Sequence, residues 1–217
     1  KIALGYTLDE IKNEVTGKTY ACFEPVLDYV VVKIPKWPFK KFLTASRILG
    51  TQMKATGEVM AIAPNLEAGL MKAIRSLEEN VEYFYLDKLK DLEKTELEEK
   101  LKIVDNERIF VIAEAIRKEI SVERIDEITT IDRFFIGIIY KLVKMEKELQ
   151  LNQMNPKLLE KAKKYGFTDK VIGMLSGKSE EEIKKLRNKY GIQPNFKMVD
   201  TCAAELEAQK NGIAHVW

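Results

Sequence analysis

The stretch TQMKATGEVMAI, from Thr51 to Ile62, is the segment that decides how this chain begins to fold. Its second half, Glu58 to Ile62, is apolar apart from one acid and has the composition of a β-strand. Gly57 stands just before that strand, where the lack of a side chain relieves crowding of the backbone. We therefore predict a strand over Glu58–Ile62.

Glu58 is the unusual residue of this strand. Because side chains alternate along a strand, Glu58 and Met60 share one face and the residues between and after them share the other. An ionised carboxylate among apolar residues needs a partner or water. Two interpretations stay open: an ion pair with a lysine such as Lys33 or Lys54, which the spacing favours, or a polar group that lines a wet channel.

Residues 1 to about 62 mix a helix with short β-like runs. The run Tyr29–Ile34 is β-branched and predicts a strand that Pro35 closes. Upstream, Thr7–Glu10 has the pattern of a capping box, which predicts a short helix that ends near Gly17. Between the strands, Phe39–Phe42 is expected to begin a short helical turn.

From Pro64 onward the pattern is almost entirely helical. Capping residues predict helices that begin at Asn65, Thr95, Asp105, Ser121, Thr130, Asn155, Thr168 and Ser179. The helix from Thr130 to about Leu149 is the longest. Its apolar face is wider than a surface helix needs, which places it at the centre of a bundle. The residues of that face are Ile131, Phe134, Phe135, Ile138, Ile139, Leu142 and Val143. The aromatic run Glu82–Asp87 favours a buried loop over a binding platform.

Composition excludes several classes of protein. With 217 residues, 46% hydrophobic and 32% charged, the chain is expected to be globular and soluble. A net charge of +2 gives no support for nucleic-acid binding. Apolar runs stay below about 18 residues, so we expect no membrane contact. Two distant cysteines, Cys22 and Cys202, favour a reduced, cytoplasmic protein over a disulfide. The start at Lys1, without methionine or signal peptide, suggests a fragment or processed piece.

Residues that could carry chemistry are few. His215 is the single histidine and has no partner pattern for acid–base or metal chemistry, and Cys202 has no adjacent histidine or cationic group. The run Thr16–Thr19 resembles the end of a phosphate-binding loop, but Lys12 stands where its first glycine is required. We expect no catalytic, cofactor-binding or metal-ligating residue in this chain.

Five runs together resemble the large subunit of carbamoyl phosphate synthetase. They are Gly5–Glu10, Phe23–Pro35, Gln52–Ile62, Thr130–Phe135 and Val199–Glu205, in that order along the chain. The similarity covers about residues 1–205. After Glu205 the sequence departs from the family, and an artificial end, a reading-frame change and a natural split-gene end all stay open.

The resemblance implies a mainly α fold, with a helical oligomerisation domain and a small α/β remnant of an ATP-grasp domain at the N-terminus. The implied boundaries are 1–77 for the remnant of the carboxyphosphate-forming half, 78–200 for the oligomerisation domain, and 201–217 for a linker or tail. Met53 and Glu58 match positions that line the family's carbamate tunnel. The role of Thr56 on the same wall stays open.

The implied parent is a ligase that makes carbamoyl phosphate from bicarbonate, glutamine-derived ammonia and two ATP, for pyrimidine and arginine synthesis. It uses ATP with Mg (or Mn) and K, and a glutaminase small subunit. The chain contains no Glu-x-Asn-Pro-Arg run of a nucleotide site, so we expect it to bind no cofactor, to be inactive alone, and to self-associate. The alternative is a free-standing helical interaction module.

Overall fold

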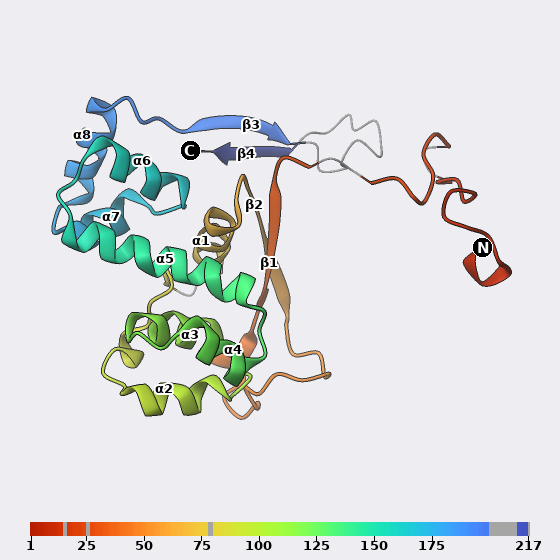
Figure 1. Ribbon diagram of the computed structural model, residues 1–217, viewed down its shortest axis with the longest axis horizontal. Helices are drawn as coiled ribbons and strands as arrows, with labels where there is room; N and C mark the ends of the chain where they lie inside the picture. The colour runs from red at the N-terminus through yellow and green to blue at the C-terminus, as the bar shows by residue number, and fades with distance from the viewer. Residues whose placement is uncertain (15–16, 25–26, 78–79, 200–211, 217) are drawn as a thin grey trace.

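One long antiparallel hairpin runs through the molecule, and helices pack against it (Figure 1). The computed structural model describes residues 1–14, 17–24, 27–77, 80–199 and 212–216. Strand β1 (Val30–Lys36) pairs along its whole length with strand β2 (Gly57–Ala63). Both predicted strands are therefore confirmed.

The expectation that Pro35 closes the first strand is wrong. Strand β1 continues through Pro35, which lies opposite Glu58, and ends at Lys36. Proline is tolerated here because the sheet has only two strands, so each strand has one edge without a hydrogen-bonded neighbour.

Helix α1 (Leu66–Ser76) covers the hairpin. It begins at the predicted cap, where Asn65 Oδ1 accepts a hydrogen bond from the backbone N–H of Ala68 at 2.8 Å. The helix contacts β1, β2 and helix α5, so it joins the sheet to the helical bundle. Gly69 makes the close contact with the sheet possible, because a Cβ there would lie 2.8 Å from Cγ2 of Val32.

Seven further helices in the described part of the chain form the bundle, with α5 at its centre. They are α2 (Lys94–Leu101), α3 (Arg108–Arg117), α4 (Val122–Thr129), α5 (Arg133–Leu151), α6 (Pro156–Lys164), α7 (Asp169–Ser176) and α8 (Glu180–Lys189). Three short 3-10 turns are η1 (Ile2–Leu4), η2 (Pro38–Lys40) and η3 (Asp87–Leu89). Helix α5 contacts α1, α3, α4, α6 and α7, as its wide apolar face predicts. The fold is mainly α with a small α/β part, as expected.

The core lies between these helices. Its largest fully buried side chains include Phe84, Phe167, Met71, Leu97, Leu101, Ile136, Leu142 and Leu149. The aromatic run therefore belongs to the core, since Phe84 is completely buried and Tyr83 nearly so. The prediction of a buried loop is confirmed. The expected boundaries at 77 and 200 stay predictions.

Three helix starts differ from expectation. Helix α3 begins at Arg108 and not at Asp105, although Oδ1 of Asp105 accepts a hydrogen bond from the backbone N–H of Glu107 at 2.9 Å. Helix α2 begins one residue before Thr95, and its capping contact runs from the backbone N–H of Glu93 to Oε2 of Glu96 at 2.9 Å. Thr130 does not open α5. It adopts a left-handed conformation (φ 55°) that ends α4, and Asp132 caps α5 instead. Phe134 and Phe135 lie in the first turn of α5 and are exposed, so their assignment to the buried face is wrong.

The predicted helix over residues 7–17 is absent from the described part of that segment. The backbone N–H of Thr7 does bond to Oε2 of Glu10 at 2.9 Å, so half of the capping box forms. The chain then makes turns and an antiparallel bridge between Lys12 and Tyr20. Residues 1–14 and 17–24 lie away from the helices (Figure 1), and a short helix without a packing surface is only marginally stable.

The C-terminal region adds a second hairpin that the sequence reading did not predict. Strand β3 (Asn195–Val199) pairs with strand β4 (Gly212–Val216), with Phe196 opposite His215. His215 therefore lies in a paired strand, and its expected lack of a role in acid–base or metal chemistry stays a prediction.

Candidate functional site

The β1–β2 hairpin presents Glu58 on its open face. Oε1 of Glu58 accepts a hydrogen bond from Nζ of Lys33 at 2.7 Å, and both side chains are more than half exposed (58% and 55%). Met60 is exposed as well, whereas Ala61 is buried, as strand alternation predicts. The ion-pair interpretation of Glu58 is therefore confirmed for Lys33.

Lys54, the other candidate partner, makes different contacts. Its Nζ donates to the backbone carbonyls of Ser46 at 3.0 Å and Ile48 at 2.5 Å. These bonds hold the loop between the two strands together. Lys54 is therefore a structural residue of that loop in this conformation.

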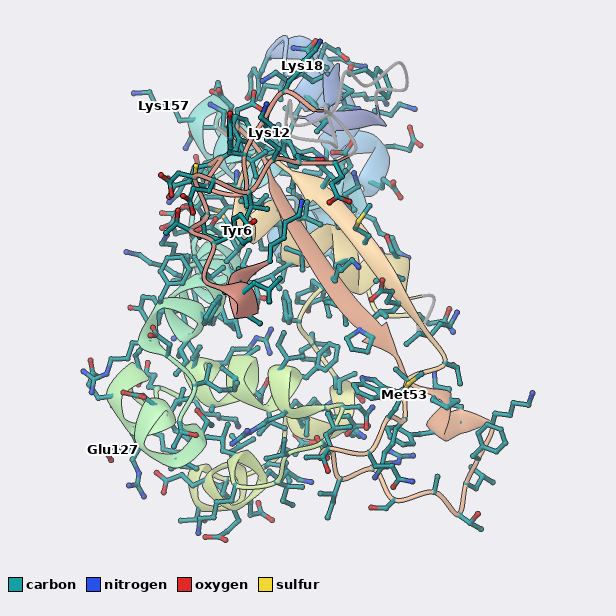
Figure 2. All side chains as sticks on the ribbon, turned by 90° about the vertical axis from the view of Figure 1, so that its right-hand side faces the viewer. Tyr6, Lys12, Lys18, Met53, Glu127 and Lys157 are labelled. Carbon is teal, nitrogen blue, oxygen red and sulfur yellow. The ribbon has the colours of Figure 1, made fainter. Side chains whose placement is uncertain are left out.

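Met53 lies in the same loop, beyond the end of the hairpin (Figure 2), and is 88% exposed. It lines an open groove of about 580 Å³ together with Phe39, Phe42 and Thr56. Glu58 does not line this groove. The structure therefore brings Met53 and Thr56 to one groove and places Glu58 on the adjacent strand face. Whether either surface conducts an intermediate stays a prediction.

The other candidates from the sequence add no reactive centre. Cys22 is exposed and carries a free thiol, whereas Cys202 lies outside the described residues. Gly17 adopts φ 64° and its N–H bonds to the carbonyl of Asn13, so it makes a turn within a small loop and does not end a helix. Among the described residues, no group of three or more histidine, cysteine or acidic side chains could hold a metal ion.

A buried ionic cluster around Arg117 was missed by the sequence reading. Arg117 donates to Glu146 from Nε at 2.8 Å and from Nη2 at 3.0 Å, and to Oε2 of Glu114 at 2.9 Å. Its Nη2 also bonds to the carbonyl of Phe84 at 2.5 Å. The cluster joins α3, α5 and the aromatic loop. The position of Glu114 inside the apolar run of α3 could have indicated a buried charge. The sequence around Glu146 gave no such indication.

The protonation properties of this cluster follow from burial and pairing. Burial alone would lower the pKa of Arg117, but hydrogen bonds and charge from Glu146 and Glu114 outweigh it and raise that pKa. Burial raises the pKa of Glu146, and Arg117 opposes that rise. Burial also raises the pKa of Tyr83 to about 12. The Arg117 guanidinium lies over the rings of Tyr83 and Tyr85, at 5.9 and 5.5 Å from their centroids.

A second missed cluster joins the last three helices. Asp169, at the start of α7, accepts hydrogen bonds from Nζ of Lys163 at 2.8 Å and from Nε of Arg187 at 3.1 Å. The side chain of Lys163 is only 4% exposed, and burial lowers its pKa. Both clusters join helices through buried ion pairs, so we assign them to stability.

A pair of aromatic side chains is exposed on the surface of the bundle. Phe134 and Phe135 stand side by side at the start of α5, with rings 5.3 Å apart in an edge-to-face arrangement. They are 62% and 54% exposed. A pair of adjacent exposed aromatic side chains costs solvation free energy unless another surface covers it.

No helix in the described part of the chain is long and apolar enough to cross a membrane.

Comparison with known proteins gives one consistent family. The family model described as "Carbamoyl-phosphate synthetase large chain, oligomerisation domain" matches residues 58–191. Carbamoyl phosphate synthase large chains are 58% identical in Lachnoclostridium phytofermentans over 211 residues, and 51% identical in Caldanaerobacter subterraneus subsp. tengcongensis over 208 residues. These matches cover 96% of this chain but only 20% and 19% of the relatives, so the chain spans about a fifth of their length.

Proposed function

The chain belongs to the family of carbamoyl-phosphate synthetase large chains, and we propose that its function is to hold copies of such a large chain together. The observation that carries this proposal is the extent of the family match. Residues 58–191 include the whole of α1 to α8, which is the bundle centred on α5. The bundle is therefore the oligomerisation domain of this family.

The chemistry of the parent protein is part of the same proposal. A complete large chain would combine bicarbonate, glutamine-derived ammonia and two ATP into carbamoyl phosphate in the cytoplasm, for pyrimidine and arginine synthesis. It would use Mg (or Mn) and K, ATP-grasp domains outside this chain, and a glutaminase small subunit.

The activity claim has a direct test. We expect the 217-residue chain to show no bicarbonate-dependent ATP turnover, because its parent's nucleotide sites would lie elsewhere. The measurement is a coupled ATPase assay with and without bicarbonate, with a complete large chain of the family as the positive control. Robust bicarbonate-dependent turnover by the 217-residue chain would overturn this part of the proposal.

For the self-association, we assign Phe134 and Phe135 to the contact with a second copy. Three observations support this choice. The pair lies inside the matched oligomerisation domain, it is exposed at the end of the central helix, and no residue described in the chain covers it. Two equivalent pairs meeting across a two-fold axis would bury each other, which is the arrangement that symmetric dimers use.

Light scattering after size exclusion tests this assignment. The unaltered chain should elute as an oligomer. The double variant Phe134→Ser/Phe135→Ser should raise the dissociation constant of that oligomer at least tenfold, so that it elutes as a monomer. The control is Met174→Ser on α7, which removes an exposed apolar side chain elsewhere. A strict monomer at high concentration would instead support a free-standing interaction module.

The tunnel role of Met53 and Glu58 is a separate proposal. It is supported by their exposure on a groove and on a strand face, surfaces that further domains of a large chain could cover. The test is Glu58→Ala in a complete large chain. We expect the partial ATPase reactions to continue while overall synthesis falls. If both stay normal, Glu58 serves only its ion pair with Lys33.

A further inference from the structure

A small pocket of about 110 Å³ lies where helix α1 meets the end of α6, and its wall is rich in cations. Lys72 and Arg75 reach it from α1, and Lys163 and Lys164 reach it from the last turn of α6. The rest of the wall is alanine, proline and glycine, and no acidic side chain of the described residues lines it. We call this site the basic pocket, because it gathers positive charge from two helices that are distant in sequence.

Direct hydrogen bonds between its two walls hold the basic pocket in shape. Nη1 of Arg75 donates to the carbonyl of Gly166 at 2.8 Å, and Nδ2 of Asn65 donates to the carbonyl of Lys164 at 3.1 Å. The packing beside the pocket is close, since a Cβ on Gly166 would lie 3.0 Å from Cα of Ala68. The walls are therefore formed before a ligand arrives, which lowers the cost of binding one.

The two lysines on the α6 side already have carboxylate partners. Nζ of Lys163 donates to Oδ1 of Asp169 at 2.8 Å. Nζ of Lys164 lies 2.8 Å from Oε1 of Glu160. Burial lowers the pKa of Lys163, Asp169 opposes that change, and the positive charge of Arg75 adds to it. The charges on the two walls therefore repel each other across the pocket, and an anion between them would relieve that repulsion.

The α1 side keeps hydrogen-bond donors that are not in use. Nζ of Lys72 donates to the carbonyl of Ile62 at 3.2 Å, and Arg75 donates from Nη1 alone. Burial lowers the pKa of Arg75, and Glu82 opposes this through its charge without a hydrogen bond. Among the buried and half-buried residues that the structure describes, only Oδ1 of Asn106 is both fully enclosed and without a partner. The remaining N–H groups of Arg75 are therefore open to solvent.

We propose that the basic pocket binds one phosphoryl oxyanion, whose oxygens accept hydrogen bonds from Nε and Nη2 of Arg75 and from Nζ of Lys72. Charge-assisted bonds of this kind are strong, and the guanidinium fork matches the geometry of a phosphoryl group. The volume equals that of about three to four water molecules in the liquid, which admits a phosphoryl group but not a whole nucleotide. The bound anion holds α1 against the turn between α6 and α7. This inference is independent of the oligomerisation proposal.

Calorimetric titration of the chain with inorganic phosphate tests the proposal, with chloride used to keep the ionic strength constant. We expect saturable binding of one phosphate per chain. Lys72→Gln should raise the dissociation constant at least tenfold, because a hydrogen bond to a charged group is lost. Lys157→Gln, at an exposed lysine near the start of α6 (Figure 2), is the control and should leave the dissociation constant unchanged.

A second measurement on the unaltered chain locates the ion even if Lys72→Gln does not fold. Phosphate should shift the amide resonances of Lys72, Arg75 and Gly166 in the ¹⁵N-labelled chain, with the same saturation as the calorimetric signal. Absence of saturable binding, shifts that saturate only elsewhere, or equal losses for Lys72→Gln and Lys157→Gln would each overturn the proposal.

Phenyl phosphate distinguishes the two sources of such an anion, because it carries the same phosphoryl group on a ring. An affinity equal to or higher than that of inorganic phosphate would identify the ligand as the phosphoryl group of an organic phosphate. A lower affinity would identify it as the free ion, enclosed by the pocket on all sides that an ester would need.

Discussion

Arg117 of α3 and Glu146 of α5 face each other through two parallel hydrogen bonds, from Nε to Oε2 at 2.8 Å and from Nη2 to Oε1 at 3.0 Å. The same guanidinium bonds to Glu114 and to the backbone of the aromatic loop. Three elements that are distant in sequence therefore share one buried cation. A pair in this geometry is strong because both groups are ionised and bidentate.

Removing the cation should be costly. Arg117→Met leaves two carboxylates buried without their partner, so we expect the free energy of unfolding to fall by about 3–5 kcal/mol in urea titrations. The triple change Arg117→Met/Glu114→Leu/Glu146→Leu should recover most of that loss, because no buried charge is left unpaired. As a control, Glu119→Ala at the exposed pair with Lys147 should cost less than about 1 kcal/mol. Similar costs for Arg117→Met and Glu119→Ala would contradict this view of the cluster.

Tyr83 provides a spectroscopic prediction from the same region. Its pKa is raised from 10.0 to about 12, mainly by burial and next by the charge of Glu146. The folded state thus keeps a proton that the unfolded state loses between pH 10 and 12, so this contribution to stability is complete below pH 10 and disappears as pH rises. Titration of phenolate absorbance at 295 nm should show a late component that Tyr83→Phe removes. Tyr140→Phe, at an exposed tyrosine, should leave that component in place.

Local signals explain which parts of the fold were predictable. The caps at Asn65, Asn155 and Ser179 were found because a helix start is decided by a side chain within three residues of it. The strand Gly57–Ala63 was predicted, as Glu58–Ile62, because its apolar composition is local information that needs no knowledge of the partner strand. The prediction of a helix over residues 7–17 was wrong because a local capping pattern is not enough. A short helix also needs a surface to pack on, and that information is not local.

The buried charges could not be predicted in the same way. Glu146 lies between Met145 and Lys147, and nothing local distinguishes it from a solvated acid. Its role depends on Arg117, 29 residues away. For Glu58 the sequence left two lysines, Lys33 and Lys54, as possible partners, and only the pairing of β1 with β2 identifies Lys33 as the partner.

Asp169 joins the last three helices, because it accepts hydrogen bonds from Lys163 and from Arg187. Asp169→Ala removes this one carboxylate from two side chains that are 4% and 11% exposed, and we expect a loss of about 3–5 kcal/mol in the free energy of unfolding, because removing one member of a buried ion pair is strongly destabilising. Glu160→Ala, at the exposed pair with Lys164 on α6, is the matched control and should cost about 0.5 kcal/mol or less. A loss for Asp169→Ala no larger than that of the control would show that Lys163 is not held as an ion pair.

Two glycines in helices should respond in opposite directions to the same substitution. At Gly173 of α7, an added Cβ would lie 2.7 Å from the carbonyl oxygen of Lys178 and 3.1 Å from the carbonyl carbon of Ser179. Both atoms belong to the backbone of the tight turn into α8, so neither can move without disturbing the start of that helix. Gly173→Ala should therefore lower the free energy of unfolding by about 1–3 kcal/mol, despite the better helix propensity of alanine.

At Gly137 of α5, a Cβ meets no atom within 4 Å. Only the propensity effect remains, so Gly137→Ala should raise the free energy of unfolding by about 0.5–1 kcal/mol. Urea titrations of the two variants at one low protein concentration measure both effects on the same scale and keep self-association out of the comparison. Since the substitution is identical, a difference in sign isolates the steric contact between α7 and the turn. Equal effects would mean that the turn at Lys178 and Ser179 can move away from α7.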